Sequence, residues 1–167
     1  NMVSPEVLRK YRLFAGQSNY MLEEMAMLTS EVELEAGEWL FHENEPAAHL
    51  YIVTEGAISL CLYLYLNGSG QHIESTSPLG PREAIGWSAL VKPHIYTFGA
   101  RAEKKSRLIA FPAEPLRELL DDNPGFGYYL LKNLAEVIGD RLTSKCVQLL
   151  SLVLDKKGEP ILSKSVR

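Results

Sequence analysis

A series of short apolar segments, separated by turn-forming residues, occupies the middle of the chain. Between residues 31 and 111 these segments recur at intervals of about 8–12 residues, which is typical of all-β folds with many short strands. Residues 31–35 alternate apolar and acidic side chains, which predicts a strand with one buried face. The Asn-Gly-Ser-Gly sequence at 67–70 predicts a hairpin turn. The pattern favours an antiparallel sandwich, roll or barrel, with strands expected at 31–35, 39–41, 50–54, 58–66, 72–77, 96–102 and 107–111.

Helical patterns flank this region on both sides. Residues 3–29 carry apolar side chains at roughly helical spacing, and Ser18 or Asn19 could cap a second helix within them. Residues 114–153 are predicted to be helical, with a break at 121–124. We therefore predict an α+β fold, mainly β: an antiparallel, jelly-roll-like β-roll with N-terminal helices and a long C-terminal helix. The expected organisation is a single domain over 3–154, with the roll at 31–111, the long helix at 124–154 and a polar tail at 155–167.

The composition is that of an ordinary globular protein and narrows the function classes. Hydrophobic residues make up 46% and charged residues 23% of the chain. The net charge of −4 argues against a general nucleic-acid or anionic-membrane binder, which would carry a basic surplus. No run approaches the ~20 apolar residues of a membrane span, and no signal-peptide pattern is present. Cys61 and Cys146 lie in different predicted elements, without a CxxC motif or a Cys/His cluster, so we expect a cytoplasmic protein with reduced thiols.

The candidate ligand site lies in residues 86–102, Gly-Trp-Ser-Ala-Leu-Val-Lys-Pro-His-Ile-Tyr-Thr-Phe-Gly-Ala-Arg-Ala. Its first glycine permits a close backbone turn before a predicted short helix, and N–H groups at a helix N-terminus attract anions. The Ser88 hydroxyl would add a donor, whereas Trp87, Tyr96 and Phe98 offer apolar faces that suit an aromatic or apolar ligand. The candidate ligand-binding residues are Gly86, Trp87, Ser88, Ala89, Leu90, Tyr96, Thr97 and Phe98.

This segment resembles the phosphate-binding cassette of cyclic-nucleotide-binding domains, the sensor module of the catabolite activator protein family. In that family a Gly-Glu-x-Ala-Leu start is followed, after a short loop, by Pro-Arg-x-Ala-Thr, and Gly86, Ala89 and Leu90 stand at the matching positions. Trp87 replaces the family's Glu, and Tyr96 replaces the Arg that neutralises the cyclic phosphate. Losing one hydrogen bond to a charged group weakens binding by about ten- to a hundredfold. A substitute positive charge could come from Lys92, His94 or Arg101.

The resemblance covers most of the chain, from about residue 13 to residue 150. Further matches stand at 36–38, 50–56 and 79–81, and the long helix follows where the family places its dimer helix. Its apolar stripe, Leu131–Val153, has the alternating steps of three and four that pair helices. We therefore predict a homodimer through this stripe; packing of the whole stripe within one chain is the alternative. At two turns where the family often has Gly, this chain has Asn44 and Arg82.

Family transcription factors continue into a helix-turn-helix domain. Only about a dozen residues follow Val153, too few for such a domain, so we expect no direct DNA binding. The resemblance implies a sensor with no required cofactor, whose effector is a cyclic nucleotide or another small molecule. On this hypothesis, the ligand shifts residues 86–91 and the long helix between two arrangements, and an unknown downstream protein partner senses the difference.

Two other functions have weaker support. The metal-capable side chains that cluster in sequence are His42, Glu43, Glu45 and His49, but a cupin-like metalloenzyme would require His at Ala47, so surface histidines on a turn are the alternative. Ser88 lies near His94 in sequence without a Gly-x-Ser-x-Gly elbow, so no enzymatic activity is predicted. The remaining alternative is a ligand-free protein-interaction module in which Trp87 fills the pocket and packs with Tyr96.

Overall fold

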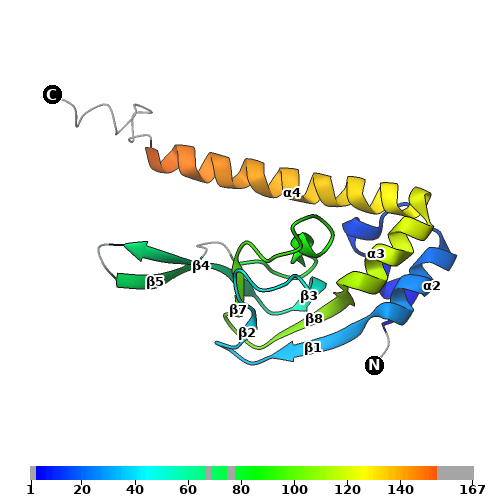
Figure 1. Cartoon of the computed structure of the whole chain (residues 1–167), viewed down its shortest axis with the longest axis horizontal. Coiled ribbons are helices and arrows are strands. Elements are labelled where there is room, and N and C mark those ends of the chain that lie inside the picture. The colour runs from blue at the N-terminus through cyan, green and yellow to red at the C-terminus, as the bar shows by residue number, and fades with distance from the viewer. Residues whose placement is uncertain (1–2, 67–68, 75–77, 154–167) are drawn as a thin grey trace.

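The computed structural model describes residues 3–66, 69–74 and 78–153, and Figure 1 shows its layout. It is an α+β fold, mainly β, in which two four-stranded antiparallel sheets form a roll flanked by helices. One sheet has, in spatial order, β1 (Ser30–Leu34), β8 (Ser106–Pro112), β3 (His49–Glu55) and β6 (Ala84–Ile85). The other sheet has β2 (Trp39–Phe41), β7 (Gly99–Ala102), β4 (Ile58–Leu66) and β5 (Ser69–Glu74). The predicted antiparallel β-roll is confirmed.

The apolar strand segments form the core of the roll. The four residues Leu50–Val53 are all buried, because β3 lies inside its sheet and both of its faces are covered. Ile58 from β4 and Phe111 from β8 are fully buried in the same core. By contrast, the acidic residues of β1 are exposed while Val32 and Leu34 are partly buried, as the alternation predicts. Burial of this apolar surface is the main favourable term in folding.

Short helices precede the roll, as the sequence predicts. They are α1 (Pro5–Leu8), the 3₁₀ turn η1 (Arg12–Phe14) and α2 (Asn19–Leu28). The hydroxyl of Ser18 accepts a hydrogen bond from the N–H of Met21 at 3.3 Å, so Ser18 is the N-cap of α2. Leu22 and Met25 face inward from α2 and are fully buried.

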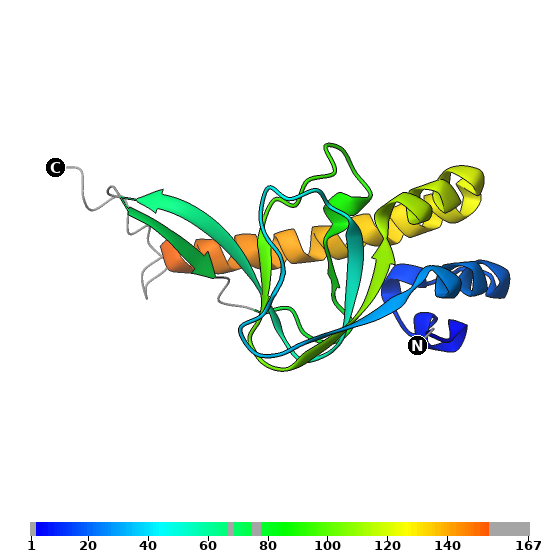
Figure 2. The same cartoon turned by 60° about the horizontal axis from the view of Figure 1, so that its bottom comes forward.

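Two helices follow the roll. They are α3 (Ala113–Asp122) and α4 (Pro124–Val153), and the break between them at Asn123 confirms the predicted split. The residue before a proline avoids the helical region, which is why α3 ends at this position. Figure 2 shows α4 running from α3 across the roll toward the β4–β5 hairpin. Within the described ranges, no helix has the length and apolar character that crossing a membrane requires.

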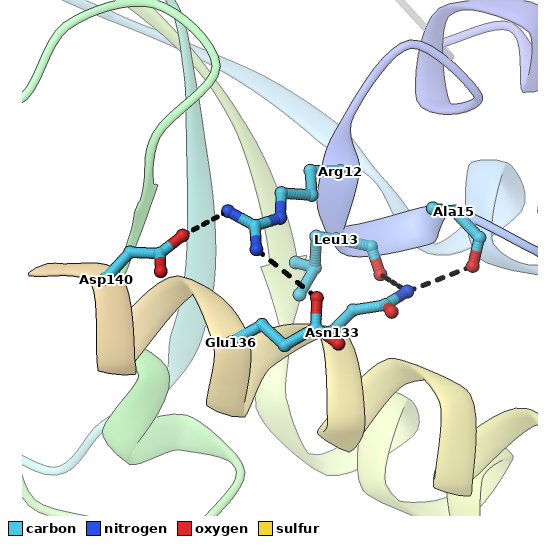
Figure 3. A network of polar contacts seen from close by, with 6 residues as sticks. All are labelled: Arg12, Leu13, Ala15, Asn133, Glu136 and Asp140. Atoms are coloured by element: carbon cyan, nitrogen blue, oxygen red, sulfur yellow. Dashed lines mark hydrogen bonds and ion pairs between the residues drawn. The ribbon is translucent and has the colours of Figure 1, made fainter.

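Polar contacts attach α4 to the N-terminal segment (Figure 3). The side-chain amide of Asn133 donates to the carbonyl of Leu13 at 3.1 Å and to the carbonyl of Ala15 at 3.0 Å. The guanidinium of Arg12 pairs with Asp140, and with Glu136 at 3.3 Å. These contacts hold α4 over the roll, above the candidate site.

Three details differ from the predicted elements. The strand expected at 96–102 begins only at Gly99, because the main chain of Tyr96 bonds to the turn at Asn44 and Glu45 instead of to a neighbouring strand. The two-residue strand β6 was not predicted, since it is too short to show a periodic pattern. Residues 75–77 of the strand expected at 72–77, Leu154 of the long helix and the tail 155–167 lie outside the described residues.

Candidate functional site

The candidate site begins at a sharp turn between β6 and a single 3₁₀ turn, η2 (Trp87–Ala89). Gly86 makes this turn with a φ of 79°, in the left-handed region that favours glycine. A Cβ atom at Gly86 would lie only 2.8 Å from the carbonyl oxygen of His49. The close backbone approach predicted for Gly86 is therefore confirmed, and no other residue type fits this position without a shift.

A cavity of about 30 Å³ lies next to this turn, which is room for about one water molecule. Its lining brings together most of the predicted ligand-binding residues and four others: Gly86, Trp87, Ser88, Tyr96, Thr97, Phe98, Phe41, Leu60, Ile85 and Arg141. Ala89 is fully buried in the core and Leu90 packs against that core, so both support the turn and neither is among the lining residues.

An aromatic stack explains why the cavity is small. The ring of Tyr96 lies 3.7 Å from that of Phe41, centroid to centroid, at an interplanar angle of 12°, and Phe41 stacks in turn on Tyr51. The Tyr96 hydroxyl donates to the carbonyl of His49 at 2.8 Å and accepts from its N–H at 3.0 Å. Burial raises the pKa of Tyr96, so its hydroxyl stays neutral. Tyr96 thus contributes an apolar ring, and no charge, to the cavity.

A larger apolar groove of about 500 Å³ adjoins the cavity and shares Leu60, Trp87, Phe98 and Arg141 with it. It lies where α4 passes the β4–β5 hairpin (Figure 1). The groove is lined by Leu60, Leu62, Ile73, Trp87, Phe98, Ile138, Arg141, Leu142 and Lys145. Trp87 is partly buried and borders both spaces, so a molecule in the groove would contact the turn that begins at Gly86.

Arg141, on α4, brings a positive charge to the cavity beside the Gly86 turn. Its guanidinium donates to the carbonyl of Ala84 at 2.9 Å and lies 3.8 Å from the carboxylate of Glu83. The Arg141 side chain is only 19% exposed. Burial lowers the pKa of Arg141, and the nearby charge of Glu83 opposes this effect. Arg141 lines both the cavity and the groove, and it is attached to β6 just before the Gly86 turn.

Arg141 was not among the cations that the sequence suggested for this site. Lys92 is exposed, His94 lines a separate cleft beside α3, and the guanidinium of Arg101 lies 5.8 Å from the centre of the Trp39 ring. None of these three lines the cavity. A usable sequence clue was the position of Arg141 three residues after Ile138, which places an arginine on the apolar face of α4.

Two weaker candidates from the sequence were a metal site near His42 and a catalytic pair of Ser88 and His94. The imidazole Nδ1 of His42 lies 3.2 Å from the carboxylate of Glu45, and no three His, Cys, Asp or Glu side chains in the described part of the chain are grouped to hold a metal ion. Ser88 lines the small cavity, whereas His94 lines the cleft beside α3.

The fold matches that of several solved structures. A candidate cyclic-nucleotide-binding protein from Geobacter metallireducens GS-15 is 32% identical, with a TM-score of 0.74 over 84% of this chain and 99% of that chain. The N-terminal domain of a transcriptional regulator from Streptomyces coelicolor A3(2) is 30% identical, with a TM-score of 0.63 over 83% of this chain and 94% of that chain. The catabolite activator protein of Thermus thermophilus, 23% identical, shares the fold with a TM-score of 0.63 over 84% of this chain and 62% of that chain.

Among curated proteins, no relative matches. The family model described as the cyclic nucleotide-binding domain matches residues 31–123, from the second residue of β1 to just past the end of α3. This match covers more than half of the chain, and the Gly86 turn lies within it. The chain therefore belongs to the cyclic-nucleotide-binding domain family.

Proposed function

We propose that this chain is a regulatory domain that senses a small molecule other than cAMP or cGMP. The family consists of sensor domains, and no catalytic role, required cofactor or DNA contact is proposed for the described residues. The observation that supports this proposal is the set of contacts made by Tyr96, which stands at the position of the family's phosphate-binding Arg. Its ring is stacked on Phe41, and its hydroxyl donates its proton to the carbonyl of His49 and accepts from the N–H of His49.

The proposed ligand site is the turn with its cavity and groove. We assign direct contacts to Trp87, Ser88, Thr97, Phe98 and the ring of Tyr96. Gly86, Ala89 and Leu90 shape the turn that positions them. A cyclic nucleotide would find no positive charge at Tyr96 and no carboxylate at Trp87. Each lost charged hydrogen bond costs about 1.5–3 kcal/mol, or roughly one to two orders of magnitude in affinity.

Calorimetric titration with cAMP and with cGMP tests this proposal. We expect no binding tighter than micromolar for either nucleotide. Submicromolar binding of either one would overturn the proposal, because it would mean that the site recognises a cyclic phosphate despite Trp87 and Tyr96.

The contact between Arg141 and Ala84 suggests how ligand binding at this site would affect the rest of the protein. Arg141 joins α4 to β6, two residues before Gly86, and both elements border the groove. A ligand that binds one arrangement of α4 more tightly than another would shift the population between them. A partner that contacts α4 would then detect the ligand.

We further propose that the chain acts as a cytoplasmic homodimer. The first half of α4 packs on the roll, with Leu130 and Leu134 buried, whereas Leu142 and Leu149, seven residues apart on one face of the helix, are 64% and 61% exposed in the single chain. A row of exposed apolar residues on a helix favours pairing with a second apolar surface, and a twin helix is the simplest partner.

A second candidate function is a protein-interaction module that binds no small molecule. The small volume of the cavity beside Gly86, about 30 Å³, favours it. Native mass spectrometry of the purified protein separates the two functions: a retained small molecule supports the sensor, and its absence, together with failure of any ligand to raise the melting temperature, supports the module.

A further inference from the structure

The groove between α4 and the β4–β5 hairpin combines an apolar lining with charge of one sign. Seven of the nine lining residues are apolar or aromatic, and the other two are Arg141 and Lys145. These cations stand four residues apart on α4 and therefore lie on the same side of the helix. No acidic residue is among the described residues that line this groove.

The guanidinium of Arg141 retains unused hydrogen-bonding capacity. A guanidinium carries five N–H donors, and the described residues accept one hydrogen bond from Arg141, at the carbonyl of Ala84. The carboxylate of Glu83 forms an ion pair with Arg141 at 3.8 Å, beyond hydrogen-bond distance, and lines a neighbouring cleft that Arg141 and Lys145 also border. A mostly buried guanidinium is stabilised further when its remaining N–H donors also find acceptors.

We propose that the ligand is a small amphipathic anion, with an apolar body in the groove and a carboxylate or similar acidic group on Arg141. This inference rests on the proposed function, since it names the chemical class of the ligand at that site. The apolar body would pack against Trp87, Phe98 and Ile138, which line the groove. The planar guanidinium presents paired donors that match the two oxygens of a carboxylate, which makes arginine the better of the two cations for this contact.

The position of Arg141 also gives the anion a structural effect. The bond to Ala84 attaches α4 to the strand that leads into the Gly86 turn. An acidic group bound to the remaining donors of Arg141 would pull on the guanidinium that also bonds to the Ala84 carbonyl. Ligand binding is therefore expected to alter the attachment of α4 to β6.

Two fluorescent probes with one aromatic framework test the ligand class. The anionic probe is 8-anilinonaphthalene-1-sulfonate, and the neutral one is N-phenyl-1-naphthylamine, which lacks the sulfonate. The chain has two tryptophans, so in a Trp39→Phe background only Trp87 remains, and its quenching on titration reports on the groove. We expect the anionic probe to bind with one equivalent per chain and at least about tenfold more tightly than the neutral probe.

Substitutions then assign the difference to Arg141. Arg141→Gln is expected to lower the affinity for the anionic probe by about ten- to a hundredfold. The affinity for the neutral probe should stay the same, which would also show that the groove is still formed in the variant. Arg141→Lys keeps the positive charge but loses the paired N–H donors. Its affinity for the anionic probe should therefore lie between that of the parent and that of Arg141→Gln. Two control variants should leave the affinities of both probes unchanged: Arg107→Gln, at an exposed arginine on β8, and Tyr128→Gln, at an exposed aromatic residue of α4 outside the groove lining.

The outcomes separate this inference from the function on which it rests. Equal affinities for the two probes, an Arg141→Gln variant that binds the anionic probe as tightly as the parent, or no binding of either probe would overturn the amphipathic anion. None of these results bears on cyclic nucleotides. Submicromolar cAMP or cGMP binding to the same protein would instead overturn the proposed function, whatever the probes do.

Discussion

The hydroxyl of Tyr96 bonds to both main-chain polar groups of His49, accepting from the N–H at 3.0 Å and donating to the carbonyl at 2.8 Å. Strand β6 pairs with β3 only at Tyr51 and Ile52, so His49 lies beyond the end of that pairing. Tyr96 takes the place of the missing strand partner. A residue at the position of the family's phosphate-binding Arg has therefore become part of the framework of the roll.

Tyr96→Phe should reduce stability. The change keeps the ring on Phe41 but leaves the N–H and carbonyl of His49 without their partner, which costs about 1–3 kcal/mol in the free energy of unfolding. Chemical denaturation measures this loss. Tyr128→Phe is the matched control, since the Tyr128 side chain is 63% exposed on α4 and its replacement should change little. Equal stabilities of the two variants would show that the Tyr96 hydroxyl has no structural role.

Arg82→Gly should increase stability. Arg82 has a φ of 77°, and a left-handed conformation costs a side-chain-bearing residue about 1–2 kcal/mol. Glycine removes this strain, but it also raises the conformational entropy of the unfolded chain, which lowers stability by about 0.5–1 kcal/mol. We therefore expect a net gain of about 0.5–1 kcal/mol in the free energy of unfolding, measured by chemical denaturation. Asn44, with a φ of 65°, provides the comparison. Because Asn tolerates this conformation, Asn44→Gly should gain less, and a reversed order would contradict the explanation.

Stability should depend on pH through His49. Burial lowers the pKa of His49 below its ordinary value of 6.5, so the unfolded chain takes up this proton at a higher pH than the folded chain does. The contribution of His49 is complete above pH 6.5 and is lost as the pH falls from 6.5 to the folded-state pKa. The advantage of the parent over His49→Gln should therefore shrink on acidification.

Two measurements check this pH dependence. Denaturation of the parent and of His49→Gln across the acidic range gives the difference in unfolding free energy. An NMR titration, with the His49 signal identified by its loss in the variant, gives the midpoint directly. A His49 midpoint at or above 6.5 would contradict the role assigned to burial.

Leu149→Glu should separate the proposed dimer. Leu149 is 61% exposed on α4 in the single chain, and a carboxylate in a helix–helix seam would have to be desolvated. We expect sedimentation at micromolar concentration to give a dimer for the parent and a monomer for the variant. Thr143→Glu adds the same charge at an exposed position of α4 that is not one of the apolar residues of the stripe, so this variant should remain dimeric. A monomeric parent would refute the dimer.

Several features of this protein depend on neighbours in sequence, and these could be predicted. The Ser18 cap depends on a residue three positions away, the helix break at Asn123 depends on Pro124, and the left-handed turn depends on Gly86 itself. The alternation in β1 specifies which face is buried whatever the partner strand is. The order of such local features was enough to predict the β-roll and the family.

The character of the site was decided by tertiary structure. Tyr96 was predicted to lie on a strand, yet its hydrogen bonds go to His49, 47 residues away, and to the turn at Asn44 and Glu45. Arg141 and Ala84 are 57 residues apart and meet only because α4 crosses the roll. Sequence spacing carries no information about such contacts, since they exist only after separate elements have packed. The sequence by itself therefore determined the scaffold and the loss of the two charged cassette residues, whereas packing decided that the positive charge beside the groove comes from Arg141 on α4.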